Sequence, residues 1–153
     1  MLFSCGWQPV YYRNDSAIPI QTAYVDVLPI PEESGRLLVQ RLKDLLNPQN
    51  ENVEKKYILS VSLSEEINKD QGILEDNTST RATMQITARF QLKGKNKLLL
   101  NDSSFVASSY NILMLPYPTV TAQKATRERL IGMLADKIAM RLAVYFKNLE
   151  QEE

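Results

Sequence analysis

The run TRATMQITARFQL, from Thr80 to Leu92, decides the fold of this 153-residue chain. Successive side chains of a β-strand point to opposite faces of the sheet, so a period of two predicts one buried and one wet face. The apolar side of the run begins at Thr80 and continues through Ala82, Met84, Ile86, Ala88, Phe90 and Leu92. Arg81, Thr83, Gln85, Thr87, Arg89 and Gln91 alternate with these residues. We therefore predict a long strand with a core face and a water-facing face.

A hairpin is predicted directly after this strand. The loop Lys93–Lys97 contains Gly94, and the run Leu98–Ile112 is again typical of a strand. An antiparallel pair of about 13 residues a side would be roughly 40 Å long. Its tip would carry Lys93, Lys95 and Lys97.

Two further strands are predicted before the hairpin. Tyr57, Leu59, Val61 and Leu63 alternate with Ser60, Ser62 and Ser64. The polar stretch from Asn68 to Asn77 predicts a turn after that strand. Within it, residues Ile73–Asn77 carry acidic side chains and no basic side chain that could bind an anionic lipid. The segment Thr22–Ile30, bounded by prolines, predicts the first strand of the chain.

Two amphipathic helices are predicted from apolar residues spaced three and four apart. The first begins between Pro31 and Ser34 and ends at Asn47-Pro48. The second begins near Ala122, with Thr119 or Thr121 as its N-cap. It follows the segment Leu113–Pro118, whose two prolines interrupt regular secondary structure. It should run for about 28 residues, roughly 42 Å. Its apolar stripe is Leu130, Leu134, Ile138, Leu142, Tyr145 and Leu149, broadened by Ile131, Ala135 and Phe146.

These elements predict an α+β fold, in the order β-α-β-β-β-α. A mainly antiparallel four-stranded sheet would carry both helices on one face and leave a polar face for water or a hydrophilic wall. We expect residues 1–18 to be a tether, residues 19–150 to be a single domain and residues 151–153 to be a disordered tail.

Composition excludes several kinds of chemistry. The 18 Lys and Arg residues balance 18 Asp and Glu residues, so no net charge attracts a nucleic acid. The chain has no histidine and only one cysteine, Cys5, which excludes histidine-based catalysis, zinc clusters and an intrachain disulfide. Its five glycines do not form a phosphate-binding loop. We predict no catalytic residues, no metal and no cofactor.

The short run LFSCG, residues 2–6, resembles the processing box of a bacterial lipoprotein. The four residues before Cys5 are too few for a signal peptide, so we expect that peptide to be largely missing from this sequence. The alternative is an accidental match at a terminus that carries a stray thiol. No segment has the roughly 18 consecutive apolar residues of a membrane span.

Several motifs, taken in their order, resemble one known family. CGWQPVY at residues 5–11 is similar to the mature start of the lipopolysaccharide-assembly lipoproteins, the LptE family. The order of strand, helix and long hairpin agrees, as do RLLVQRL at 36–42, SYN at 109–111 and LADKI at 134–138. The resemblance covers nearly the whole chain.

This resemblance implies a lipoprotein of the Gram-negative outer membrane, lipidated at Cys5 and facing the periplasm. It would sit in a large LptD-like β-barrel, plug it, assist its assembly and help to deliver lipopolysaccharide to the outer leaflet. Basic residues would meet the phosphates and acidic sugars of lipopolysaccharide. The candidates are Lys93, Lys95, Lys97, Arg81, Arg89, Lys124 and Arg127. Leu113, Met114, Leu115 and Tyr117 are candidate partner contacts.

Two other classes of function stay open at this point. A periplasmic lipoprotein that carries a small apolar ligand or lipid would have a sizeable apolar pocket between sheet and helices. An enzyme could use adjacent carboxylates, either Glu65 with Glu66 or Glu75 with Asp76. Neighbouring strand residues point to opposite faces, so both pairs make poor catalytic dyads.

Overall fold

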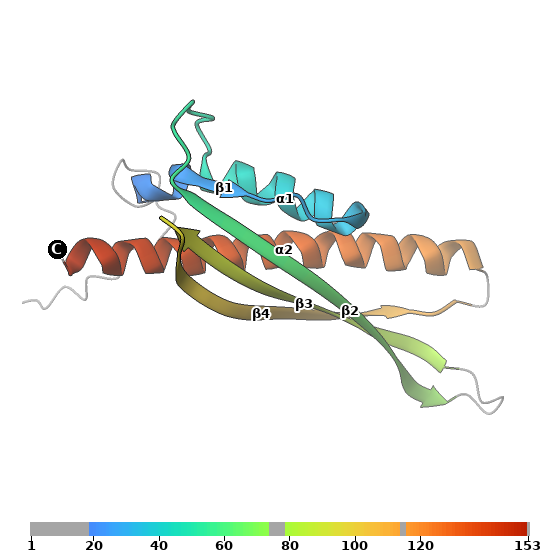
Figure 1. Ribbon diagram of the computed structural model, residues 1–153. Helices are drawn as coiled ribbons and strands as arrows, with labels where there is room; N and C mark the ends of the chain where they lie inside the picture. The colour runs from blue at the N-terminus through green and yellow to red at the C-terminus, as the bar shows by residue number, and fades with distance from the viewer. Residues whose placement is uncertain (1–18, 74–78, 114–115, 153) are drawn as a thin grey trace, which may run out of the picture.

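A computed structural model describes residues 19–73, 79–113 and 116–152 of the chain. Its α+β fold contains the four strands and two long helices that the sequence predicts (Figure 1). In chain order the elements are a 3₁₀ helix η1 (Ile20–Tyr24), β1 (Val25–Val27), α1 (Glu32–Leu46), β2 (Tyr57–Ile73), β3 (Ser79–Gly94), β4 (Lys97–Asn111) and α2 (Pro116–Gln151). Within these residues, neither helix is sufficiently long and apolar to cross a membrane.

The sheet is mixed, with the strand order β1-β2-β3-β4. The pairs β2–β3 and β3–β4 are antiparallel, whereas β1 runs parallel to β2, with Val25 beside Tyr57 and Val27 beside Leu59. The mainly antiparallel sheet predicted from the sequence therefore contains one parallel pair. The reason is that α1 lies between β1 and β2 in the chain and acts as the crossover that a parallel pair requires.

The alternating pattern of β3 is confirmed by its burial. Ala82, Met84, Ile86, Ala88, Phe90 and Leu92 are all buried. Arg81 and Arg89 on the opposite face are exposed. The register carries this alternation across the sheet, since Leu59, Leu92 and Leu100 share one row. The sheet thus has an apolar face and a polar face.

β2 is longer than the sequence predicts. It continues to Ile73 instead of turning near Asn68, because its backbone pairs with β3 up to Ser79, with an irregularity after Asp70. The ladder of hydrogen bonds to β3 outweighs the weak strand propensity of the Asn, Asp and Gly residues there. Figure 1 shows this end of β2 and β3 curving away from α2. Residues 74–78, including the predicted pair Glu75 and Asp76, lie outside the described residues.

α2 begins earlier than predicted, at Pro116, and its 36 residues make it about 54 Å long. Pro116 and Pro118 fall in the first turn, where backbone N–H groups have no partner within the helix, so they do not break it. The predicted N-caps are wrong because both threonines lie inside the helix, where the Thr121 hydroxyl donates to the Tyr117 carbonyl at 3.1 Å. The helix ends at Gln151, one residue into the segment predicted as a tail.

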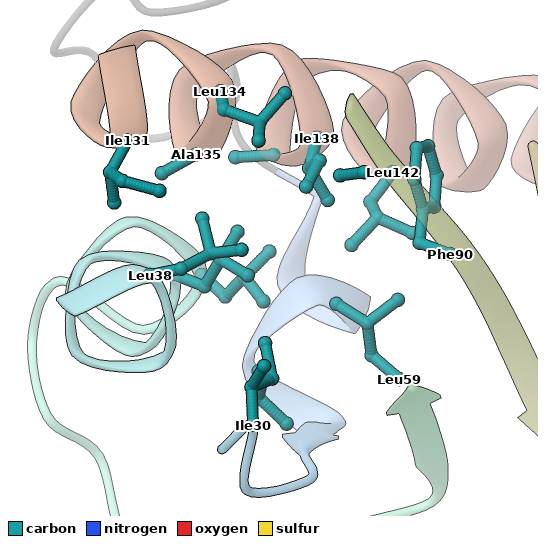
Figure 2. Packing of buried hydrophobic residues seen from close by; sticks show 14 of the residues in the cluster. Ile30, Leu38, Leu59, Phe90, Ile131, Leu134, Ala135, Ile138 and Leu142 are labelled. Atoms are coloured by element: carbon teal, nitrogen blue, oxygen red, sulfur yellow. The ribbon is translucent and has the colours of Figure 1, made fainter. Parts of the chain in front are cut away.

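Both helices pack on the apolar face of the sheet. α2 runs along β3 and β4, and α1 lies beside α2 over β1 (Figure 1). Leu134, Ile138 and Leu142 of α2 are fully buried. Figure 2 shows them approaching Leu59 and Phe90 from the sheet and Leu38 from α1. Burial of each such side chain stabilises the fold by about 1.5–3 kcal/mol.

The predicted first strand, Thr22–Ile30, is only partly correct. The chain forms η1 up to Tyr24 and pairs as a strand for only the three residues of β1. The buried Thr22 hydroxyl hydrogen-bonds the carbonyls of Pro19 at 2.9 Å and of Leu46 at 3.0 Å, so it binds the end of α1 to the start of the domain. Such contacts require a turn at this point and override the strand propensity of the segment.

Candidate functional site

The predicted lysine cluster lies at the tip of the β3–β4 hairpin. Lys95 and Asn96 both have positive φ, 50° and 61°, as in the two-residue turns that match the twist of paired strands. A Cβ at Gly94 would lie 2.9 Å from side-chain atoms of both Leu99 and Tyr57, so a larger residue there would force these side chains to shift. Lys93, Lys95 and Lys97 are exposed. This end of the sheet is also the end at which α2 finishes (Figure 1).

The polar face of the sheet carries mostly small hydroxyl and amide side chains, with the 60% exposed side chain of Phe105 on β4 beside Thr87. Its register places Arg89 between Ser62 of β2 and Ser103 of β4, and all three are exposed. Further along, the hydroxyls of Thr83 and Ser109 share a hydrogen bond of 3.1 Å. Arg81 lies on the same face eight residues before Arg89, about 26 Å away along the strand. The two arginines therefore do not form one site.

The two basic candidates on α2 lie on the other side of the sheet. Arg127 donates to both carboxylate oxygens of Glu65, from Nη2 at 2.7 Å and from Nε at 2.8 Å. These hydrogen bonds, which the Glu65 carboxylate accepts from the guanidinium, raise the pKa of Arg127. Lys124 lies 4.0 Å from Glu33, with both side chains well exposed. The guanidinium of Arg127 is therefore already paired with a carboxylate of the same domain.

The seven predicted basic residues consequently fall into separate groups. Lys93, Lys95 and Lys97 gather at the hairpin tip, Arg81 and Arg89 lie apart on the polar face, and Lys124 and Arg127 lie on α2. Only the tip brings three cations together. Cys5 lies outside the described residues.

An apolar patch marks the beginning of α2. The exposed fractions of Leu113 and Tyr117 are 53% and 80%, and Val120 adds 60%. The Leu113 N–H donates to Thr119 Oγ1 at 2.9 Å, and that hydroxyl donates back to the Leu113 carbonyl, so the segment is held against the helix. Met114 and Leu115 lie outside the described residues. Val120 was not predicted, although its spacing of three from Tyr117 would have indicated it once the helix start was known.

A line of polar contacts between α2 and β4 was also not predicted. Arg129 donates to the Ser108 hydroxyl, Lys137 to the Phe105 carbonyl at 3.0 Å, and Arg141 to the Asp102 carboxylate at 2.5 Å. Hydrogen bonds from Arg141 and from the Ser103 N–H lower the pKa of Asp102. These contacts fix the helix along the edge of the sheet.

The geometry gives no support to a catalytic or metal site in the described part of the chain. Glu65 and Glu66 are adjacent on β2 and project to opposite faces, and Glu65 already holds Arg127. No group of three or more metal-ligating side chains comes together among the described residues.

Comparison with solved structures gives the same fold. A protein described as a lipoprotein from Caulobacter crescentus has a TM-score of 0.65 and 19% identity, covering 82% of this chain and 94% of that one. Rare lipoprotein B from Shewanella oneidensis has a TM-score of 0.65 and 15% identity, covering 82% and 96%. A minor lipoprotein from Acinetobacter baumannii has a TM-score of 0.61 and 20% identity, covering 80% and 92%. No curated protein matches the sequence.

The fold and its uncovered polar face define an α+β domain of the kind seen in these bacterial lipoprotein structures. The family described as lipopolysaccharide-assembly, LptE, matches residues 20–142. The chain belongs to the LptE family, and the resemblance inferred from its motifs is confirmed.

Proposed function

We propose that this chain is a lipoprotein of the outer membrane, attached through acyl chains on Cys5, that plugs an LptD-like β-barrel and assists its assembly. In this position it helps to deliver lipopolysaccharide to the outer leaflet. Membership of a family of non-enzymatic lipopolysaccharide-assembly lipoproteins supports the general role. Two or more acyl chains would make the attachment to the membrane stable.

The observation that carries the barrel proposal is the uncovered polar face of the sheet. Most sheets in small domains bury their apolar face and leave the other to water, and here the second face is mainly hydrophilic along the hairpin, with Phe105 as an exposed apolar side chain on it. Ser62, Ser64 and Arg89 are exposed on it. The interior wall of an outer-membrane channel is also polar and wet, so the two surfaces are compatible without burying apolar groups.

The length of the domain supports the same arrangement. α2 is about 54 Å long, and the apolar outer band of a membrane barrel is only about 25 Å tall. A rod of this length, placed in a barrel, would fill the lumen and still extend into the periplasm. The apolar patch of Leu113, Tyr117 and Val120 then provides a contact for the barrel or its loops at one end.

Lipopolysaccharide carries phosphates and acidic sugars, which lysine and arginine bind by charge-assisted hydrogen bonds. Among the predicted candidates, we propose Lys93, Lys95 and Lys97 as its contacts, because they are exposed together at the hairpin tip. Arg89 lies four residues before Lys93 on the same polar face. Arg127 is not retained, because its guanidinium is held by Glu65.

The carrier alternative is not favoured. A carrier needs a sizeable apolar pocket between the sheet and its helices, but Leu59, Phe90, Leu134 and Leu142 fill the centre of that space and are at most 1% exposed (Figure 2). The apolar cavity left at its margin, between β2 and the start of α1, is about 230 Å³, smaller than the roughly 300–1,000 Å³ of typical ligand pockets. A hollow of about 590 Å³ lies at the surface between β1 and the end of α1, and its lining mixes the charged Asp26, Lys43 and Asp44 with the apolar Val25, Val27 and Leu46.

The proposal is tested by expressing the complete reading frame with a carboxyl-terminal tag in a Gram-negative host and extracting the envelope in mild detergent. We expect a large β-barrel protein to co-purify at a one-to-one ratio. A photoreactive amino acid at Thr87 or Tyr117 should crosslink to that protein. Purification of the chain alone and monomeric would contradict the barrel role.

The anchor is tested separately with the Cys5→Ser variant. This variant should lose the acyl mass of the mature protein and the attachment to membranes that depends on it. Mass spectrometry and membrane flotation measure both effects. An unmodified Cys5 in the wild-type protein would contradict the lipidation proposal and leave the barrel proposal untouched.

A further inference from the structure

The two outer edges of the sheet differ in how their backbone groups are satisfied. β4 forms one edge. At the other edge β1 pairs only with Tyr57, Ile58 and Leu59 of β2, so the rest of β2 extends beyond it. A free edge exposes N–H and C=O groups that can pair with another strand.

Side chains occupy part of the edge at β4. Alternation in an antiparallel pair directs the backbone groups of Ser103 and Phe105 away from β3. The Ser103 N–H donates to Asp102 Oδ1 at 2.8 Å, and the Phe105 carbonyl accepts from Lys137 Nζ at 3.0 Å. Arg141 holds the Asp102 carboxylate in place. An incoming strand would have to displace these partners.

The edge at β2 has no such side-chain partners among the described residues. Its last backbone hydrogen bond toward β1 runs from the Leu28 N–H to the Leu59 carbonyl, at 3.0 Å. The same alternation then directs the N–H and C=O groups of Val61, Leu63, Glu65 and Ile67 outward. No described strand lies beside this segment, which spans about 23 Å.

A cavity of about 230 Å³ adjoins this edge, between β2 and the start of α1. Ile30, Val61, Leu63 and Ile86 provide its apolar lining. Val61 and Leu63 are half-buried, and Ile67 is 39% exposed, so apolar side chains follow the edge on the helix side. On the polar side the edge carries the exposed carboxylate of Glu66.

We propose that the β2 edge from Val61 to Ile67 accepts an extended segment of a different protein chain as an added strand. Backbone hydrogen bonds bind the segment, alternate apolar side chains enter the cavity, and a basic side chain on the other face lies beside Glu66. This inference goes beyond the proposed barrel function and does not depend on it.

A second copy of this chain is a poorer occupant. Its own β2 edge carries the exposed carboxylate of Glu66, so pairing two β2 edges would place like charges of both copies on one face of the interface. Its β4 edge is partly occupied by Asp102 and Lys137. Charge and edge occupancy therefore both favour a basic segment from another protein.

The test uses the full chain and a synthetic peptide, KVTVKVT, with the acidic peptide EVTVEVT as the matched control. Amide hydrogen exchange, followed by NMR, should slow at least about tenfold at Val61, Leu63, Glu65 and Ile67 when KVTVKVT is added. Exchange at Ser103 and Ala107 of β4 should not change. The acidic peptide should give weaker protection at the same concentration.

Two proline variants distinguish peptide binding at the β2 edge from binding at the β4 edge. In both Ile67→Pro and Ala107→Pro the lost N–H points away from the sheet, so the ladder is kept and the fold should survive. Ile67→Pro should weaken peptide binding at least about tenfold, and Ala107→Pro should leave it unchanged. If Ile67→Pro does not fold, the exchange data on the wild-type protein decide the question.

Three results would overturn the proposal. One is the absence of protection at millimolar KVTVKVT, and another is protection located on β4. The third is a protein that sediments as a dimer with its β2 edge amides already protected, which would make a second copy the occupant. None of these results bears on co-purification with a barrel, so the two proposals fail independently.

Discussion

The guanidinium of Arg127 and the carboxylate of Glu65 meet in a two-pronged contact, with 2.7 Å and 2.8 Å between their atoms, across 62 residues of sequence. Each side chain is 29% exposed. The contact joins the first third of α2 to the middle of β2.

A double-mutant cycle with Arg127→Gln and Glu65→Gln should give a coupling free energy of about 1 kcal/mol, because paired, half-buried charges with two hydrogen bonds are stronger than exposed pairs. Urea unfolding measures it. The matched control is the pair Lys124 and Glu33, at 4.0 Å, with exposures of 62% and 70%. Equal coupling in the two cycles would show that the two-pronged geometry has no energetic effect.

The pair of Asp102 and Arg141 predicts a dependence of stability on pH. Hydrogen bonds from Arg141 and from the Ser103 N–H lower the pKa of Asp102 below 3.8 in the folded protein. A lowered pKa stabilises the fold above the unfolded value, and that contribution disappears as the pH falls through the folded value. Asp102→Asn should therefore lower stability at pH 7, by less than about 1 kcal/mol because the pair is partly exposed.

Thermal unfolding of wild type and Asp102→Asn at neutral and acidic pH measures this effect. The difference between the two proteins should shrink as the pH falls through the folded pKa of Asp102, because the carboxyl group then becomes protonated in the folded as well as the unfolded state. A difference that is the same at both pH values would contradict the assignment to charge.

Binding of lipopolysaccharide should depend on the hairpin tip. Changing Lys93, Lys95 and Lys97 to Glu should weaken binding to lipopolysaccharide micelles by at least about tenfold, because like charges then face its phosphates. The control changes three exposed cations of α1, Arg36, Arg41 and Lys43, to Glu, which alters the net charge by the same amount. Equal losses in the two variants would indicate a response to overall charge, and unchanged binding would rule out the tip.

Two glycines in helices should respond in opposite directions to alanine. A Cβ at Gly35 would lie 2.6 Å from Ile30 Cγ2 and 2.7 Å from the Ile30 carbonyl oxygen, so Gly35→Ala forces α1 away from the chain that precedes it. We expect a loss of about 1–3 kcal/mol. A Cβ at Gly132 meets no atom within 4 Å, so Gly132→Ala should stabilise α2 by about 0.5–1 kcal/mol. Denaturant midpoints of the two variants measure both changes.

The sequence predicted those parts of the fold that depend on periodicity. The alternation from Thr80 to Leu92 placed β3 and its buried face correctly, and the stripe from Leu130 to Leu142 placed the core of α2. Both patterns report directly on which side of an element faces the core. A short glycine-containing loop over Lys93–Lys97 was likewise expected, and the structure narrows it to a two-residue turn at Lys95 and Asn96.

Predictions failed where a distant partner decides the local structure. Asn68 to Ile73 has the composition of a turn, and only its pairing with β3 makes it a strand. Thr22 belongs to a strand by propensity, but its hydroxyl binds the Leu46 carbonyl and requires a turn. In the same way, nothing near Arg127 in the sequence indicates that Glu65 will hold it. The basic candidates could be chosen by residue type, but which of them share a surface depended on tertiary structure.

The position of α2 has a consequence for how the domain forms. α2 follows every strand in the chain, yet its residues from Leu130 to Phe146 cover the apolar row of β3. While the polypeptide is being made and exported, the hairpin can pair, but its apolar row stays exposed until the helix has been completed. The domain therefore finishes folding late, and its exposed apolar strands are prone to association in the interval between the two events.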